Sequence, residues 1–411
     1  MKHFTAYELK QFLDIHVVGQ DHVKQSISVL LSNKAMNNEL YNTIHYSTLL
    51  LIGPAGVGKT ILLKKAAEYI DAPLTRISAL SLLSQHAQIS NYTNIIIEQL
   101  IDHTIKHKTL LCQQKYSTNA LQLAKDKVID ILSKLLNEDR AKIRKNFNKQ
   151  KYNQTIIPIS SHYHYQDQLT NNTHMPVTAA IQFIQEKELE IMLSMHDFSH
   201  EAIHEVQLTG IVIIDDIDKL AVNPFTSNTS AQTKQLEICQ RQLTELLSGI
   251  EIHTKYGTIN SRGLVFVCMG HFNDTQISHL LPELQSKLLN ISYCQSLTKD
   301  DMLLILTSIE NNLLSQYIKM LKTLQLDINL DFDAIEALCD CAYNHNQTET
   351  NLGIIRLYSL IDKLFEPFFL HTQTYKNHAT SHSQSINITK EYILELFTNP
   401  EETYDYSRYI L

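Results

Sequence analysis

The first hundred residues change their apolar pattern twice. Up to about residue 42 the apolar positions recur with helical spacing, and few helix breakers interrupt them. In TLLLIGPAGVGKT, residues 48–60, a short apolar run leads into a glycine-rich turn. From Ile61 the apolar positions return to helical spacing. This order predicts a helical segment, a buried strand, a tight turn and an amphipathic helix.

Two further apolar runs occur much later in the chain. In IVIIDDIDKL, residues 211–220, four apolar residues precede Asp215 and Asp216. This pattern predicts a buried parallel strand that carries acidic side chains at its carboxyl end. GLVFVCMG, residues 263–270, predicts another buried strand.

The segment between these strands has a different character. Helical stretches such as NALQLAKDKVIDILSKLL alternate there with polar stretches rich in His and Asn. A connection of this length must form a structure of its own. Near the end of the chain the pattern becomes mostly helical. We therefore predict an α/β fold with a parallel sheet. The domain that contains the glycine-rich turn comprises 1–100 and 207–295, with an inserted, mostly helical domain at 101–206 and a mainly helical C-terminal domain at 296–411.

Composition narrows the class of protein. The 411 residues are 19% charged and 44% hydrophobic, which is typical of a folded globular protein. The formal net charge of −8 argues against a nucleic-acid partner. The cysteines contain no CxxC pair, no apolar run is long enough to cross a membrane, and the first residues lack the apolar segment of a secretory signal. We expect a cytoplasmic protein with neither nucleic-acid nor membrane partners.

GPAGVGKT, which ends at Thr60, matches the phosphate-binding loop (P-loop), and it has the required strand before it and helix after it. Backbone N–H groups of such a loop cradle phosphates at the start of a helix, where the helix dipole favours anions. The lysine of the motif reaches the β- and γ-phosphates, and the hydroxyl that follows it holds Mg²⁺. The predicted ATP contacts of the loop are Gly56, Val57, Gly58, Lys59, Thr60 and Ile61.

The acidic pair supplies the second half of the predicted site. Together with the P-loop, Asp215 is expected at the end of a neighbouring strand, as a direct or second-sphere partner of Mg²⁺ and a contact of ATP. Asp216 stands where nucleotide-hydrolysing proteins usually carry a glutamate that polarises the attacking water. Asp216 is therefore a candidate base that is one methylene shorter than usual.

Several segments, in the same order, resemble the HslU (ClpY) family of AAA+ unfoldases. GIVIIDDIDK resembles the family's GIVFIDEIDK, LLPELQSKL resembles LIPELQGRL, and ETNLGIIRL resembles TENIGARRL. LDIHVVGQD resembles the adenine-contacting segment, which places Val18 beside the base, and the final YSRYIL resembles LSRFIL. The resemblance covers both ends and the core of the chain, whereas the middle is poorly related.

This resemblance implies an AAA+ fold, ATP and Mg²⁺ as cofactors, and polypeptide substrates. It also implies a homo-hexamer or mixed hexamer that docks on a HslV-type peptidase. Glu283 and Lys287 would reach the nucleotide of a neighbouring subunit, and Ile355 would stand at a position that touches the phosphates. The residues expected to dock on the peptidase are Arg408, Tyr409, Ile410 and Leu411.

The chain departs from the family at catalytic positions. Asp216 replaces a glutamate, which retracts the carboxylate by about an ångström, and such a misplacement can cost on the order of a hundredfold. Lys287 replaces an arginine finger and loses its planar fork, and Ile355 replaces a sensor arginine. Met269 replaces a serine, and SQHAQIS at 84–90 lacks the aromatic residue of the family's pore loop. These departures predict weakened hydrolysis.

Two functions of different classes remain open. The first is an ATPase subunit that unfolds proteins and activates HslV; the second is a non-hydrolysing regulatory or scaffold subunit, in a mixed ring or as a gate of the peptidase. A ClpX-like unfoldase is disfavoured because no cysteine of an amino-terminal zinc module precedes Cys112. The acidic balance disfavours a DNA-directed motor.

Overall fold

A computed structural model gives the fold of most of the chain. It describes residues 4–40, 48–81, 92–147, 151–159, 173–222, 231–273, 275–309, 312–370 and 385–398. The chain divides into two compact units. The first unit comprises Met1–Ile97, Val206–His253 and Thr258–Leu411, and the second comprises Glu98–Glu205 and Thr254–Gly257.

A five-stranded parallel sheet lies at the centre of the first unit, in the order β2-β5-β8-β1-β9. The apolar residues that precede Asp215 in β5 are fully buried, as are nearly all residues of β1 and β8. This burial explains their continuous apolar pattern. The strands are β1 (Thr48–Ile52), β2 (Leu74–Ser78), β5 (Ile211–Asp215), β8 (Val265–Gly270) and β9 (Ile291–Tyr293).

The acid-bearing strand is not the immediate neighbour of the P-loop strand, which differs from the expectation from the sequence. β8 lies between them, with Leu51 of β1 opposite Met269 and Ile213 of β5 opposite Val267. An apolar run identifies a buried strand but does not identify its neighbours. Because the strands are parallel, their carboxyl ends still meet at one edge of the sheet, where ligands of such sheets bind.

Helices and short elements pack around this sheet. The first helix begins with a capping box in which Thr5 and Glu8 exchange hydrogen bonds, and Leu13 and Leu62 join the sheet residues in one apolar core. The helices are α1 (Ala6–His16), α2 (Asp21–Leu40), α3 (Lys59–Ile70), α9 (Ala231–Ser248) and α10 (Pro282–Gln285). The short elements are β6 (Glu251–Thr254), β7 (Gly257–Asn260), η2 (Ile217–Leu220), η3 (Ser261–Gly263) and η4 (Ile277–His279).

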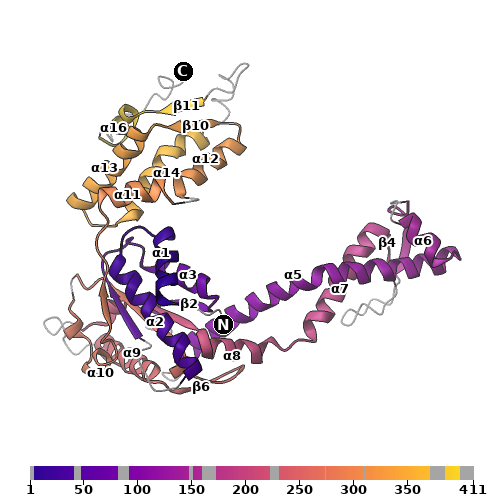
Figure 1. Cartoon of the computed structure of the whole chain (residues 1–411), viewed down its shortest axis with the longest axis horizontal. Coiled ribbons are helices and arrows are strands. Elements are labelled where there is room, and N and C mark those ends of the chain that lie inside the picture. Colours follow the sequence, from indigo (N-terminus) through magenta and orange to yellow (C-terminus); the bar gives the residue numbers. More distant parts are fainter. Residues whose placement is uncertain are drawn as a thin grey trace. The chain divides into compact units, whose positions relative to one another are not determined.

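The C-terminal part of the first unit is mainly helical, as the sequence predicts (Figure 1). Its interior contains the fully buried side chains of Leu338, Leu357 and Phe365. A short parallel pair of strands, β10 and β11, accompanies the helices. The elements are α11 (Lys299–Thr307), α12 (Leu313–Thr323), β10 (Asp327–Leu330), α13 (Phe332–Thr348), α14 (Ile354–Leu370), β11 (Ser385–Ile388) and α16 (Lys390–Thr398).

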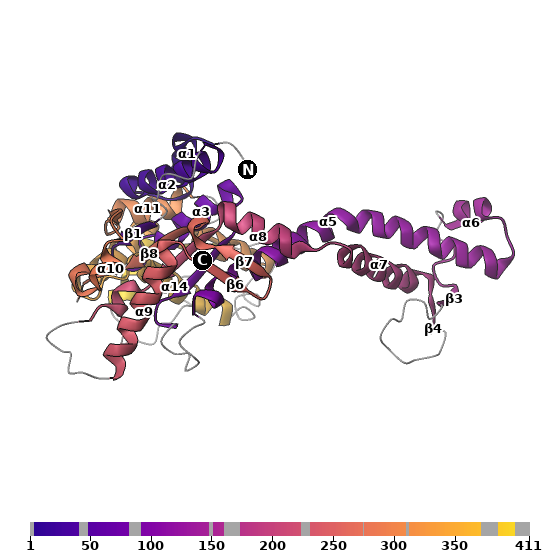
Figure 2. The ribbon, with the colours of Figure 1, turned by 90° about the horizontal axis from the view of Figure 1, so that it is seen from below.

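The second unit has a core of its own. In Figure 2 helix α7 runs alongside the long helix α5, and Lys127 of α5 donates to Glu188 of α7 at 2.6 Å. Val128 and Ile184 are fully buried in the apolar cluster of this unit. The elements are α5 (Tyr92–Leu136), α6 (Arg140–Phe147), β3 (Ile156–Ile159), β4 (Thr173–Pro176), α7 (Val177–Ser194) and α8 (Phe198–Thr209), of which α5 and α8 continue into the first unit.

Candidate nucleotide site

The P-loop leaves the start of α3 open to a ligand. Gly58 precedes the helix with a φ of +96°, and no side chain caps the helix start within the described residues. A Cβ at Gly58 would meet only Val17 Cγ1, at 3.7 Å, so the glycine is required by its backbone angle and not by crowding. The uncapped N–H groups of the first helical turn can therefore bind an anion such as a phosphate.

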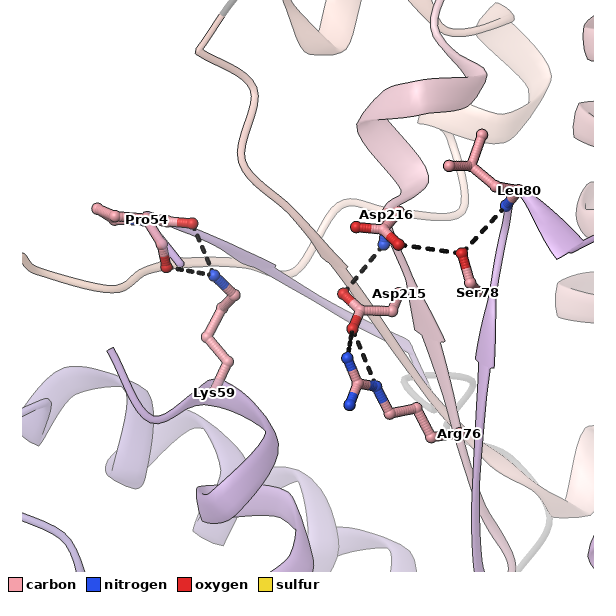
Figure 3. Close-up of polar contacts among 8 residues, drawn as sticks. Pro54, Lys59, Arg76, Ser78, Leu80, Asp215 and Asp216 are labelled. Carbon is pink, nitrogen blue, oxygen red and sulfur yellow. Dashed lines mark hydrogen bonds and ion pairs between the residues drawn. The ribbon is translucent and has the colours of Figure 1, made fainter. Parts of the chain in front are cut away.

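Lys59 lies under the loop with little exposure to solvent. Its side chain is 8% exposed, and its ammonium donates to the carbonyl oxygens of Gly53 at 2.6 Å and Pro54 at 2.7 Å (Figure 3). Burial lowers the pKa of Lys59 below its ordinary value, although nearby acidic groups oppose this shift. Neutral carbonyl groups solvate the ammonium without cancelling its charge, so a phosphate would be a better partner.

The acidic pair at the end of β5 is directed toward β2 (Figure 3). The guanidinium of Arg76 forms an ion pair with Asp215 Oδ2, which its Nε reaches at 3.0 Å. The Ser78 hydroxyl donates to Asp216 Oδ2 at 3.0 Å, and the Asp216 N–H donates to Asp215 Oδ1 at 3.0 Å. Both carboxylates are thus held by side chains of one neighbouring strand.

The backbone of Asp216 is also unusual. Its φ of +58° lies in the left-handed region, which residues other than glycine seldom adopt. This geometry turns the chain directly from β5 into η2. It also fixes the direction in which the side chain of Asp216 points at the end of β5.

Arg76 and Ser78 did not stand out in the sequence. The segment LTRIS alternates polar and apolar residues, which is compatible with a strand but does not identify its partner. The register of the sheet identifies the partner strand as β5, because it places Leu74 opposite Ile211 and Ser78 opposite Asp215. A third acidic side chain, that of Asp218, is also buried near this edge of the sheet, at 4% exposure.

The turn before α14 contacts the P-loop directly. The Ile354 N–H donates to the Gly56 carbonyl oxygen at 3.0 Å. A Cβ at Gly56 would lie 2.2 Å from the Leu352 carbonyl oxygen. A Cβ at Gly353 would lie 2.6 Å from the Ala55 carbonyl oxygen. Two glycines are therefore needed for this close approach of two backbones.

We expect Gly353→Ala to destabilise the protein more than Gly19→Ala. Both positions have φ near +60°, so each alanine incurs about 1–2 kcal/mol of backbone strain. Only Gly353 adds a clash with backbone atoms, because a Cβ at Gly19 would meet Asp301 at an ordinary 3.5 Å. The expected total for Gly353→Ala is about 2–4 kcal/mol. Equal melting temperatures of the two variants would mean that this contact does not form in solution.

Ile355 lies beside the loop, and the neighbouring arginine does not. Ile355 is 50% exposed, and its Cγ1 would be 3.2 Å from a Cβ at Gly56. Arg356 forms an ion pair with Glu349 at 2.7 Å and donates to the Thr350 carbonyl oxygen at 3.4 Å. The arginine of this segment is therefore engaged elsewhere, and an apolar side chain faces the P-loop.

Of the other predicted site residues, Val18 lies near the P-loop, whereas Glu283 and Lys287 lie apart from it. Val18 is half-buried in the turn after α1, where its neighbour Val17 approaches Gly58. Glu283 is exposed in α10, and the Lys287 carbonyl oxygen accepts a hydrogen bond from Thr48. Thr48 begins β1 whereas the P-loop follows its end, so the backbone of Lys287 lies at the other end of this strand. The pore-loop segment at 84–90 and Arg408, Tyr409, Ile410 and Leu411 lie outside the described residues.

The donor atoms at this edge suit Mg²⁺ and a nucleotide. The Thr60 hydroxyl at the start of α3 and the Asp215 carboxylate are oxygen donors, which Mg²⁺ prefers. Within the described residues no group of at least three His, Cys, Asp or Glu side chains could hold a metal ion. Mg²⁺ bound with a nucleotide needs no such group, because phosphates and water supply most of its ligands. The open helix start and the buried Lys59 fit the phosphates.

Comparison with known proteins agrees with this geometry. The model of the ATPase family associated with various cellular activities (AAA) matches residues 49–161, which begin just before the P-loop. Together with this match, the parallel sheet that carries the P-loop and the acidic strand is consistent with an α/β AAA+ fold, which confirms the predicted fold class. Within the described helices none is long and apolar enough to cross a membrane.

Two relatives match the chain along its whole length. Each is named "ATP-dependent protease ATPase subunit HslU", and they come from Thermoanaerobacter sp. (strain X514) and Thermoanaerobacter pseudethanolicus (strain ATCC 33223 / 39E). Each is 24% identical to this chain over 469 residues, and the match spans 100% of both proteins. The chain is thus similar to HslU along its whole length, which supports a divergent HslU, as the resemblance of its motifs indicated.

Proposed function

We propose that the chain is an ATP-binding subunit of a HslUV-type protease, in which it unfolds polypeptides and activates a HslV-type peptidase. The observation that supports this most is a P-loop with an open helix start and a buried Lys59, at the same sheet edge as Asp215 and Asp216. Similarity to HslU along the whole chain supports the assignment to a protease. Under this proposal the protein is cytoplasmic.

Each side chain of the cluster has a task in this proposal. Lys59 and the N–H groups from Gly56 to Ile61 bind the phosphates, while Thr60 and Asp215 hold Mg²⁺. Bound Mg²⁺ would offset the negative charge of the phosphates. Asp216 orients the attacking water. Val18 lies near the adenine base of the nucleotide.

Hydrolysis is weak in this proposal because several groups are short or replaced. The Asp216 carboxylate is retracted and also accepts a hydrogen bond from Ser78, which directs it toward β2. Ile355 lies beside the P-loop but carries no charge for the phosphates. Lys287 supplies charge without the planar fork of an arginine finger. Such arginines can be worth roughly 10³–10⁵ in rate.

The proposed assembly is a ring, either a homo-hexamer or a mixed hexamer. The backbone of Lys287 lies at the end of β1 opposite its own P-loop, and Glu283 is exposed nearby in sequence. Neither side chain therefore belongs to the cluster around Lys59 in the same chain. Both would instead reach the nucleotide of a neighbouring subunit.

A second candidate function is a regulatory or scaffold subunit that binds ATP without hydrolysing it. It is favoured by the partners that Asp215 and Asp216 already have within the chain. Steady-state ATPase assays of the purified chain, with and without a HslV-type peptidase, separate the two functions. Measurable turnover that rises with the peptidase supports the first function, and saturable ATP binding without turnover supports the second.

Removal of residues 404–411 should abolish activation of the peptidase while folding and ATP binding persist. Tyr409, Ile410 and Leu411 are aromatic or apolar residues of the segment YSRYIL, which resembles the LSRFIL segment of the HslU family. Such side chains can fill pockets of a partner, and Arg408 adds a charged contact.

Peptide-cleavage and pull-down assays with the peptidase measure this effect. A full-length variant with Tyr409→Ser, Ile410→Ser and Leu411→Ser keeps the chain length and should fail equally. Undiminished activation by the truncated chain would remove the main reason for choosing a HslV-type partner.

A further inference from the structure

A cation within the chain already occupies the carboxylate that the proposed function assigns to Mg²⁺. Arg76 of β2 forms an ion pair with Asp215 of β5, and its Nε donates to Asp215 Oδ2 at 3.0 Å (Figure 3). A second guanidinium nitrogen bonds the same oxygen. The other oxygen, Oδ1, accepts the N–H of Asp216 at 3.0 Å. Both oxygens of Asp215 therefore have donors before any ligand binds.

The two partners differ in their exposure to solvent. The side chain of Asp215 is only 14% exposed, whereas that of Arg76 is 53% exposed. A mostly buried carboxylate without a counter-ion is unfavourable, so Arg76 stabilises Asp215 when no metal is bound. Since Arg76 is half-exposed at the edge strand β2, its guanidinium can move into water at a small cost.

We propose that Arg76 is the resident counter-ion of Asp215, and that Arg76 has to release this carboxylate before Mg²⁺ can engage it. Two cations compete for the same oxygen atoms and repel each other. Arg76 is thus a positioning residue, which acts through Asp215 and sets the Mg²⁺ concentration at which the nucleotide binds. This inference rests on the proposed nucleotide site.

The competition predicts a distinctive response to Mg²⁺. A partly exposed ion pair contributes up to about 1 kcal/mol, which corresponds to roughly a fivefold change in an equilibrium constant. Arg76→Gln should therefore lower the Mg²⁺ concentration for half-maximal nucleotide binding by about three- to fivefold. Nucleotide affinity in Mg²⁺-free buffer should not increase, because Asp215 then has no metal to bind.

Equilibrium titration of the full chain with a fluorescent ATP analogue tests this, from chelated buffer to saturating Mg²⁺. Arg76→Lys keeps the positive charge without the fork, so its half-saturation should lie between those of the wild type and Arg76→Gln. Arg140→Gln is the matched control, because Arg140 pairs with Asp130 at 2.9 Å in the second unit and is 56% exposed. It should behave as the wild type does.

Several outcomes would overturn the inference. An unchanged or higher Mg²⁺ requirement in Arg76→Gln would mean that Arg76 does not compete with the metal. An equal loss of affinity with and without Mg²⁺ would make Arg76 a phosphate contact instead. If Arg76→Gln does not fold, a wild-type Mg²⁺ requirement in Arg76→Lys would overturn it. Failure of the wild type to bind the analogue at saturating Mg²⁺ would instead refute the proposed function.

Discussion

Lys59→Ala should abolish ATP binding, with affinity reduced on the order of a hundredfold or more. The ammonium is buried beneath the P-loop, where, within the described residues, it donates to the carbonyl oxygens of Gly53 and Pro54. Hydrogen bonds to charged groups contribute about 1.5–3 kcal/mol each, and the phosphates would accept more than one. Equilibrium titration with a fluorescent ATP analogue at saturating Mg²⁺ measures the loss.

Two further variants separate charge from folding. Lys59→Gln retains a donor for Gly53 and Pro54 while it removes the charge, so it should fold and still bind ATP poorly. Lys65→Ala removes a lysine from the same helix, where it pairs with Glu68 at 2.8 Å, and should leave affinity unchanged. Equal affinity of the wild type and Lys59→Ala would refute the assignment of the site.

The combined changes Asp216→Glu, Lys287→Arg and Ile355→Arg should raise ATP turnover on the order of a hundredfold or more. Glutamate restores the reach of the proposed base, and an arginine finger restores the planar fork at the neighbouring subunit. Arg at 355 would extend from a position beside Gly56 of the P-loop. The gain of the triple variant should exceed that of each single change, because such groups act as a unit.

Steady-state ATPase rates of the assembled protein at saturating ATP provide the measurement. Lys142→Arg is a control for the lysine-to-arginine change, since Lys142 is an exposed residue of the second unit. It should not alter turnover. A triple variant without any gain, or a wild-type rate equal to that of a HslU with intact motifs, would contradict the interpretation of these positions.

Local sequence signals predicted the main parts of the fold. The apolar run before Asp215 indicated a buried strand, and all of its apolar residues are fully buried. The P-loop motif indicated a strand, a turn and a helix, which are β1, the loop and α3. These signals are contained in a few consecutive residues, because burial and glycine backbone angles depend on the local pattern.

The tertiary structure alone decided which residues surround the two acids. Arg76 is 139 positions before Asp215, and Ser78 is 138 positions before Asp216, so no local pattern connects them. Only the tertiary structure shows that β8, and not β5, is the neighbour of β1 in the sheet. The contact between Gly56 and the turn at Gly353 likewise joins distant segments. A hydrophobic pattern specifies that a strand is buried, whereas its neighbours and register are set by packing over the whole sheet.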